Sequence, residues 1–271
     1  MKNKFWIFKL VIILIFFARP GLAFPHRIIS TLPSITETLF ALGLSNEVVG
    51  VTQNCNWPPE AQEKEKIGRE TVNLEKIIYL KPDLIIMLED AQKKDIEKLK
   101  KFNLPVYTVN PHSVYEVLES IYQIGSITGV TPEAERLVSE MTRKMAQAAL
   151  IYDIRFKIPV FVVVGYKPLI SVGRETFIND VINLAGGYNI AENAPSPYPQ
   201  YNFEELIKQD PPVIIVPEGL ISKEEMQKDI RWSRLRAVKN DRILFINPDI
   251  LFRPGPRVVQ AIEIIAGFIH Q

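Results

Sequence analysis

A tyrosine in a proline-rich segment is the side chain of this sequence best suited to holding a flat ligand. Tyr198 stands among Pro195, Pro197 and Pro199. A backbone stiffened by prolines presents an aromatic ring with few rotamers left to freeze, which favours stacking on a planar macrocycle. The alternative is that the ring only packs its own loop. Tyr166, which follows a predicted strand, is a second and weaker candidate for a ligand contact.

The sequence carries no arrangement of reactive side chains typical of an enzyme. A Gly-x-Ser-x-Gly nucleophile elbow, a phosphate-binding P-loop and a Gly-x-Gly-x-x-Gly turn are absent. His26, His112 and His270 lie near no paired Asp, Glu or Cys at ligand spacing, which argues against a bare zinc or manganese site. We therefore expect binding without catalysis and no resident cofactor. An exported two-lobed enzyme is an alternative that would need an acid–base pair.

The charges of the chain nearly balance. There are 32 Lys and Arg against 31 Asp and Glu, a formal net charge of +1. A nucleic-acid partner would need a clustered basic surface, so we expect a small-molecule ligand instead. Cys55 is the only cysteine, which excludes an internal disulfide.

The N-terminus has the features of an export signal. Lys2, Lys4 and Lys9 give a positive start, residues 10–17 are an apolar run, and small residues precede a cleavage site after Ala23. The run is shorter than the roughly 20 residues that span a bilayer. No cysteine stands near the cleavage site to take a lipid, so we expect a free periplasmic protein. The alternative is an uncleaved anchor.

Short β-branched runs alternate with segments of helical period, the pattern of parallel sheets with helices on their faces. Several runs are apolar without alternation, which suits strands buried on both faces. The length allows two modest α/β lobes. The predicted strands are residues 27–31, 48–51, 84–87, 106–109, 160–164, 213–216 and 243–246.

The longest helical signal lies between the fourth and fifth of these strands. Thr131 can cap a helix start, Pro132 suits the first helical position, and Glu133 favours the positive end of the helix dipole. We expect a helix over residues 132–155, roughly 35 Å long, that joins two lobes as a rigid strut. The predicted division is an N-terminal lobe at 24–130, a connecting helix at 131–156 and a C-terminal lobe at 157–271.

An internal repeat supports two similar lobes. Residues 73–86 and residues 202–215 match at identical offsets, and each copy has the pattern of helix cap, helix, proline stop and strand. A weaker echo pairs Val-Asn-Pro at 109–111 with Ile-Asn-Pro at 246–248. The copies lie on opposite sides of the long helix, as two related lobes require.

At these residues the chain resembles the helix-hinged periplasmic binding proteins of metal-chelate importers, and most of all their cobalamin-binding branch. The resemblance implies two α/β lobes, with mainly parallel sheets, that hold the ligand in a cleft between them. Loops beyond the C-terminal ends of the strands would line such a cleft. The strongest stretches are residues 32–37, Asn-Trp-Pro-Pro at 56–59, residues 73–84, residues 177–189 and Arg-Pro-Gly-Pro-Arg at 253–257.

The resemblance also implies a partner, the permease dimer of an ABC importer in the inner membrane. Glu75 and Glu204 match surface glutamates that meet permease arginines in this family. Two carboxylates at equivalent places in a repeat suit a two-fold symmetric partner. Without the resemblance, each is only a first-turn acid favoured by the helix dipole. A ligand-sensing partner of a membrane receptor is a further alternative.

Several ligand contacts follow from the same resemblance. Asp249, Phe252 and Arg253 match a segment that contacts cobalamin in the resembled branch. The chain has Asn54 and Arg69 at two positions where that branch tends to offer aromatics. An asparagine can bond the amide-bearing rim of a corrin, whereas an arginine also favours an anionic ferric chelate or haem propionates. Cobalamin is the expected ligand, with a ferric siderophore or haem as the alternative.

Two further charged residues are expected to be structural. Glu37 lies three residues after Ser34, the spacing of a capping box, so we expect it to cap the first helix. Arg257 is expected to cap or brace the final helix, which begins near Pro256.

Overall fold

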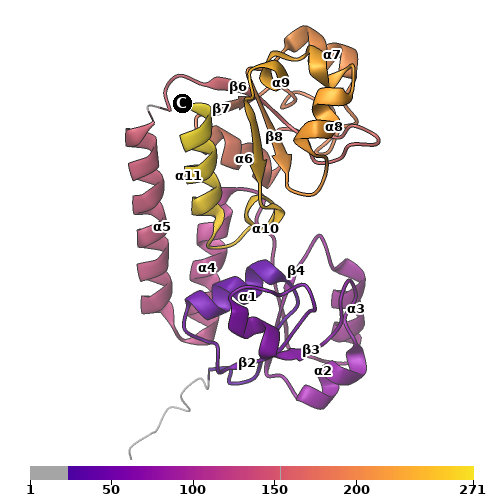
Figure 1. The fold of residues 1–271 in the computed structure, drawn as a ribbon. Coiled ribbons are helices and arrows are strands. Elements are labelled where there is room, and N and C mark those ends of the chain that lie inside the picture. The colour runs from indigo at the N-terminus through magenta and orange to yellow at the C-terminus, as the bar shows by residue number, and fades with distance from the viewer. Residues whose placement is uncertain (1–23, 153) are drawn as a thin grey trace, which may run out of the picture.

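The computed structural model describes residues 24–152 and 154–271. The predicted export signal, residues 1–23, lies outside them. Figure 1 shows two lobes, with helix α5 running along the side of both. The elements in chain order are β1 (Ile28–Ser30), α1 (Pro33–Ala41), β2 (Val48–Val51), the 3₁₀ helix η1 (Pro59–Glu63), β3 (Glu65–Lys66), α2 (Leu74–Leu80), β4 (Leu84–Leu88), α3 (Lys93–Lys101), β5 (Val106–Val109), α4 (Val114–Thr128), α5 (Thr131–Ile151), β6 (Ile158–Val162), α6 (Phe177–Leu184), β7 (Gly187–Asn189), α7 (Phe203–Gln209), β8 (Val213–Pro217), α8 (Lys223–Lys228), the 3₁₀ helix η2 (Trp232–Arg234), α9 (Arg236–Lys239), β9 (Ile243–Ile246), α10 (Pro248–Leu251) and α11 (Val258–Ile269).

The first lobe is built on a five-stranded parallel sheet in the order β3-β2-β1-β4-β5. Successive residues of a strand point to opposite faces, so Ile85 and Ile86 enter different hydrophobic clusters although both are fully buried. The chain leaves β1 toward β2 and later returns on the other side of β1 to form β4. Such a reversal is where open α/β sheets bind ligands, beyond the ends of the strands.

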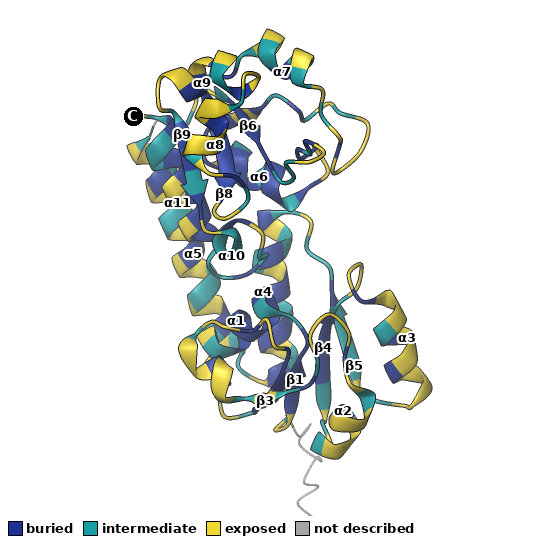
Figure 2. Cartoon of the chain, turned by 45° about the vertical axis from the view of Figure 1, so that its right-hand side comes forward, coloured by how far each residue is buried: buried dark blue, intermediate teal, exposed yellow. Residues whose placement is uncertain are grey.

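The second lobe repeats this plan with a four-stranded parallel sheet in the order β7-β6-β8-β9. Phe161 faces one hydrophobic cluster and Val160 and Val162 face the other. Figure 2 shows β8 as a dark, buried strand beneath its helices. The predicted fold class, two lobes of mainly parallel sheets flanked by helices, is confirmed.

One hydrophobic cluster is continuous through both lobes. It contains Ile28 of the first sheet, Met141 of α5 and Val160 of the second sheet. Helix α5 packs against α4 and α11 along its length. The backbone N–H of Val114, at the start of α4, also donates to the carboxylate of Asp180 on α6 at 2.7 Å. Packed helices therefore join the lobes, rather than α5 alone.

The predicted strands are all present, and β2, β5 and β9 have the predicted bounds. The sequence does not predict the short strands β3 and β7. The predicted end of the connecting helix is wrong, because α5 ends at Ile151 instead of near residue 155. Leu150 and Ile151 are already 84% and 71% exposed, so further turns would gain little packing. Within the described residues no helix is long and apolar enough to cross a membrane.

The repeat predicted from the sequence is present in the backbone. Helices α2 and α7 have seven residues each, and the side chains of Asn73 and Asn202 accept hydrogen bonds from their first turns. Both helices end in a left-handed residue other than glycine, Lys81 with φ 46° and Asp210 with φ 41°. Each unit then continues into a five-residue buried strand, β4 or β8.

Candidate ligand cleft

A cleft of about 1000 Å³ opens between the two lobes. The loops that follow β4 and β5 form its first wall. The start of α6, the proline-rich segment and the segment after α10 form its second wall. The lining residues discussed below are Asp90, Asn110 and His112 on the first wall, and Arg174, Glu175, Tyr198, Phe252 and Pro254 on the second.

A small polar cluster stands on the first wall. Asn110 Nδ2 donates to the Asp90 carboxylate at 2.8 Å, and His112 Nε2 lies 3.2 Å from the same carboxylate. The Lys93 amine lies 3.0 Å from its other oxygen. Hydrogen bonds from Asn110 and Lys93 hold the pKa of Asp90 below its ordinary value. This wall therefore presents a carboxylate that is ionised at neutral pH, beside an amide.

Tyr198 projects from a segment that is hydrogen-bonded to the neighbouring loop. The Gly173 N–H donates to the Pro197 carbonyl at 2.8 Å. A Cβ on Gly173 would lie 2.4 Å from the Ser196 carbonyl oxygen, so only glycine permits this close approach. Tyr198 keeps 58% of its surface exposed, while partial burial raises the pKa of its hydroxyl. Tyr198 therefore lines the cleft from a backbone segment that is held in place by a hydrogen bond to the neighbouring loop.

Most of the charges on the cleft lining already have partners. Among the described residues that line it, Asp90 and Glu175 carry carboxylates, Arg174 carries a guanidinium and His112 an imidazole, and Asp90 is paired with the Lys93 amine at 3.0 Å. Arg174 also lies 3.4 Å from Glu192, which reduces what it offers to an anionic ligand. A neutral ligand with an apolar face and amide groups fits this lining better than one with several carboxylates.

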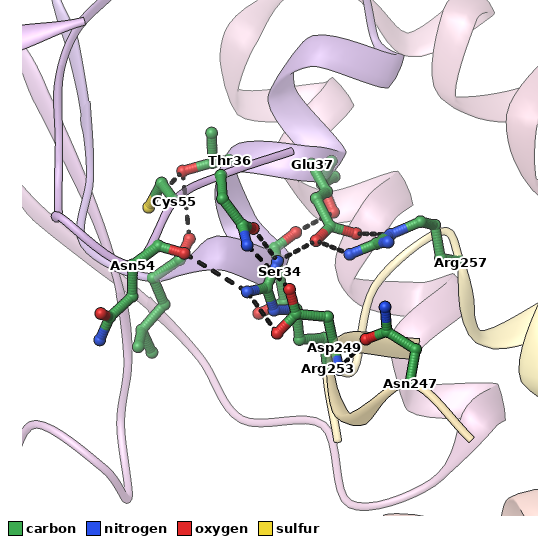
Figure 3. Close-up of polar contacts among 12 residues, drawn as sticks. Ser34, Thr36, Glu37, Asn54, Cys55, Asn247, Asp249, Arg253 and Arg257 are labelled. Carbon is green, nitrogen blue, oxygen red and sulfur yellow. Dashed lines mark hydrogen bonds and ion pairs between the residues drawn. The ribbon is translucent and has the colours of Figure 1, made fainter. Parts of the chain in front are cut away.

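A second polar group joins the lobes beside the cleft (Figure 3). Glu37 of α1 has a side chain only 2% exposed and accepts hydrogen bonds from Arg253 at 2.9 Å and from Arg257 at 2.8 and 2.7 Å. Arg253 also pairs with Asp249 at 2.7 Å and donates to Asn56 Oδ1 at 2.7 Å. We call these five residues the inter-lobe bridge.

The bridge corrects the capping role predicted for Glu37. Helix α1 begins at Pro33, and its N-cap residue, Leu32, has an apolar side chain that makes no capping hydrogen bond. The Glu37 carboxylate instead accepts from two arginines of the other lobe. Arg257 stands at the N-cap position of α11, but its side chain makes no capping hydrogen bond and donates to Glu37 instead, so its structural role is to link the lobes.

The structure brings some of the predicted ligand contacts to the cleft and some to the bridge. Tyr198 and Phe252 line the cleft. Asp249 and Arg253 lie in the bridge, where their charges already have partners. Asn54 is next to it and accepts a hydrogen bond from Arg253 through its backbone carbonyl at 3.3 Å.

Two other predicted contacts lie outside the cleft lining. The Arg69 side chain is 70% exposed and lies 3.8 Å from Glu70. The Tyr166 hydroxyl donates to Asp229 at 3.4 Å. No observation here tests ligand binding by any of these side chains, so their roles stay predictions.

Sequence reasoning did not single out the polar cluster of the first wall. Asn110 directly follows β5 and Asp90 lies two residues after the end of β4, so the rule that ligands bind beyond strand ends applies to them as well. Asn110 and the proline after it also belong to the Asn-Pro echo of the internal repeat. Applying the rule to every predicted strand would have found both residues.

The lone thiol and the histidines form no metal site in the part of the chain that the structure describes. No group of three or more His, Cys, Asp or Glu side chains there is arranged to hold a metal ion. Cys55 is buried, and its Sγ lies 3.1 Å from the hydroxyls of Thr36 and Thr52. Cys55 therefore packs as an internal group beside the bridge.

The two glutamates of the repeat lie on the surface. Glu75 is exposed in the first turn of α2 and Glu204 in the first turn of α7. Figure 1 shows these helices at opposite ends of the molecule, both on the side away from α5. Neither carboxylate has an ion-pair partner among residues 24–152 and 154–271. Both are free to meet an external cation.

Comparison with known proteins places this chain in a family. Residues 28–250 match the family model described as periplasmic binding protein. The chain is 34% identical over 254 residues to the uncharacterized ABC transporter substrate-binding lipoprotein YvrC of Bacillus subtilis (strain 168), covering 91% of this chain and 80% of that protein.

Solved structures agree with this match. The periplasmic vitamin B12 binding protein BtuF of Vibrio cholerae superposes with a TM-score of 0.81 at 28% identity, over 90% of this chain and 96% of that one. The periplasmic heme-binding protein RhuT of Roseiflexus sp. RS-1 in apo form superposes with a TM-score of 0.81 at 25% identity, over 90% and 98%. The chain belongs to the periplasmic binding protein family, a family of solute-binding proteins.

Proposed function

We propose that this protein is the substrate-binding component of an ABC importer and that it captures cobalamin or a related corrinoid. The observation that carries the proposal is the lining of the inter-lobe cleft. A pinned aromatic ring, Tyr198, stands on one wall, and an ionised carboxylate beside an amide, Asp90 with Asn110, stands on the other. The cleft of about 1000 Å³ is large enough for a macrocycle.

The chemistry of a corrin suits both walls. Its flat ring has an apolar face for Tyr198 and Phe252. Its rim carries neutral amides, which can donate hydrogen bonds to Asp90. The relative BtuF of Vibrio cholerae, a vitamin B12 binding protein, supports this assignment.

Haem or a ferric siderophore is the second candidate, and Arg174 is the observation that favours it. A guanidinium on the second wall can pair with a propionate or another anionic group. The likeness to the heme-binding protein RhuT supports this alternative. The Glu175 carboxylate opposes it, because it repels an anionic ligand within the same cleft, whereas the Asp90 charge is already paired with Lys93 at 3.0 Å.

Titration with cyanocobalamin and with haemin, followed by visible absorption, decides between the two. We expect saturable binding of cyanocobalamin and weaker binding of haemin. Asp90→Asn should weaken cobalamin binding and strengthen haemin binding, because it removes an acceptor and a negative charge together. Tight binding of haemin with none of cyanocobalamin would reject the corrinoid assignment.

Removal of the pinned ring tests the aromatic wall separately. Tyr198→Ala should weaken binding of the planar ligand by about 1 kcal/mol or more. Tyr115→Ala is the matched control, since Tyr115 is a 74% exposed tyrosine on α4 and does not line the cleft. Equal affinities of both variants and the parent would assign Tyr198 to packing of its own loop.

We propose that residues 1–23 are removed after Ala23 on export to the periplasm, which N-terminal sequencing of the exported protein tests. The partner is a permease dimer in the inner membrane, met by Glu75 and Glu204. The protein releases its ligand to that permease unchanged, without catalysis.

A further inference from the structure

Glu37 is a buried carboxylate that touches no cleft wall. Its residue is 3% exposed, and an unpaired charge at such a site would be costly. Its two oxygens accept three hydrogen bonds from two guanidiniums. Those arginines lie 216 and 220 residues further along the chain, in the other lobe. The Glu37 carboxylate therefore keeps these three hydrogen bonds only while the two lobes stay in their observed arrangement.

The other two residues of the bridge, Asp249 and Asn56, both contact Arg253. This arginine binds Asp249 within its own lobe and Asn56 of the first lobe, each at 2.7 Å. Asn56 Nδ2 in turn donates to Asp249 at 2.9 Å, so the three side chains form a closed ring across the lobe boundary. Both guanidinium-bearing side chains are 13% exposed, where water screens little.

The backbones approach closely at the same place. A Cβ on Gly255 would lie 3.2 Å from the Ser34 carbonyl oxygen, tighter than ordinary contact. The segment 252–254 is thus held between its anchor on Glu37 and this contact. Phe252 and Pro254, the neighbours of Arg253 on either side, line the ligand cleft.

We infer that Glu37 is a positioning residue for the ligand cleft: by anchoring Arg253 and Arg257 it fixes how far apart the two walls stand and where Phe252 faces. For its effect on affinity the inference rests on the proposed function, whereas its effect on lobe geometry does not. If the bridge is weakened, lobe arrangements unable to bind become populated. The apparent dissociation constant then rises in proportion to the lost binding-competent fraction.

The experiment measures lobe geometry and affinity in the same variants. Spin labels at Lys98→Cys on α3 and Lys228→Cys on α8 report the distance across the open side of the cleft by pulsed electron paramagnetic resonance. Both lysines are exposed, so cysteines at these positions are accessible to the labelling reagent, whereas the native Cys55 is buried and shielded from it. Glu37→Gln keeps the shape of the side chain but turns an amide NH₂ toward the guanidiniums. Glu133→Gln is the control, since Glu133 pairs with Arg136 at 2.7 Å inside one helix.

We expect a single narrow distance distribution in the parent and in Glu133→Gln, and a broader one in Glu37→Gln. Cyanocobalamin affinity should fall about tenfold in Glu37→Gln alone, and saturating cyanocobalamin should narrow its distribution again. A lower melting temperature of Glu37→Gln with a parent-like distribution and affinity would overturn the inference, because Glu37 would then only stabilise the fold.

A second variant and the distance measurement itself test the role of Glu37 where Glu37→Gln or cyanocobalamin binding fails. If Glu37→Gln does not fold, Arg257→Lys replaces it, since lysine keeps the charge but lacks the planar fork that donates one hydrogen bond to each carboxylate oxygen. A parent-like distribution in folded Arg257→Lys would equally overturn the inference. If the parent does not bind cyanocobalamin, the ligand assignment fails, and the distance distributions still decide the role of Glu37.

Discussion

The two repeated units, α2 with β4 and α7 with β8, have the same backbone but different surroundings. Each has an asparagine cap, a seven-residue helix and a left-handed last residue. In the second unit Phe203 packs edge-on against the fully buried Trp232 at 4.8 Å, and the Arg231 guanidinium lies 4.5 Å from the centre of the Phe203 ring. In the first unit Leu74 takes the place of Phe203, and Tyr79 is 83% exposed.

This difference separates what the repeat determines from what each lobe adds. The shared backbone places one exposed glutamate in the first turn of each helix. Each helix packs on the strand of its own unit, Ile77 with Ile85 and Leu206 with Ile214, and the added contacts of Phe203 come from outside the repeat. The two units should therefore behave alike where the shared backbone decides the outcome, and differently where the added contacts of the second unit do.

The largest effect should appear in transport. Glu75→Lys with Glu204→Lys should lower uptake into vesicles carrying the permease by about a hundredfold, because two favourable ion pairs become two like-charge contacts. Each single change should give an intermediate loss of uptake, and the two losses should be equal in size. The affinity for the ligand should stay unchanged. Glu224→Lys, an exposed first-turn acid of α8, is the control. Normal uptake by the double variant would leave both residues as helix-start acids without a docking role.

Loss of the helix caps should destabilise both units equally. Asn73→Ala and Asn202→Ala each remove a side-chain oxygen that accepts a backbone N–H, at 3.0 Å and 2.7 Å. Each change should lower the free energy of unfolding by about 1 kcal/mol. Urea denaturation measures both. A large loss in only one variant would mean that the caps are not equivalent and would break the comparison.

Acid should weaken the contacts of the second unit more than those of the first. Asp229 pairs with Arg231 at 2.7 Å, and Arg231 in turn contacts the Phe203 ring of α7. Hydrogen bonds from Arg231 lower the pKa of Asp229 to about 2. Since the folded value lies below the unfolded one, the carboxylate stabilises the protein above about pH 4, and this contribution is lost as the pH falls toward 2. Asp229→Asn should therefore cost up to about 1 kcal/mol at pH 7, after allowance for screening by solvent. Below pH 2 the variant and the parent should unfold alike, and a constant difference at all pH values would exclude this ionisation as the cause.

The smallest effect concerns the left-handed residues that end the two helices. Lys81→Gly should stabilise the protein by about 0.5 kcal/mol, because glycine adopts a positive φ without a steric penalty. Asp210→Gly should gain less or lose stability, because the Asp210 carboxylate accepts from the Arg236 N–H at 2.8 Å. Thermal unfolding of the two variants compares them. A larger gain from Asp210→Gly would show that this hydrogen bond contributes nothing.

The sequence predicts the fold well where the signal is local. Runs of β-branched residues locate the buried strands, and the Asn and Pro of each repeat locate the ends of α2 and α7. Strand β3, Glu65–Lys66, has no apolar residue, and β7 begins with a glycine beside the helix stop at Gly186. Neither has a pattern that distinguishes it from a loop.

The candidate site is predicted less completely, because its residues meet only in three dimensions. Tyr198 could be singled out because its prolines are neighbours in the sequence. Glu37 has the local spacing of a helix cap, and only its distant arginines show its actual role. Arg253 has a charge that suits either a ligand or a carboxylate, and the sequence contains nothing to choose between them.

The length of chain between Glu37 and its arginines also has a consequence for folding kinetics. A contact between residues separated by 216 positions forms late, because closing so long a loop costs more chain entropy than forming a local contact. During synthesis the first lobe is complete well before Arg253 and Arg257 exist, so the Glu37 side chain must stay hydrated until α11 docks. We expect amide protons of α1 to gain protection from exchange later than those of β1 and β4 in pulse-labelled refolding. Simultaneous protection of α1 and these strands would contradict this order.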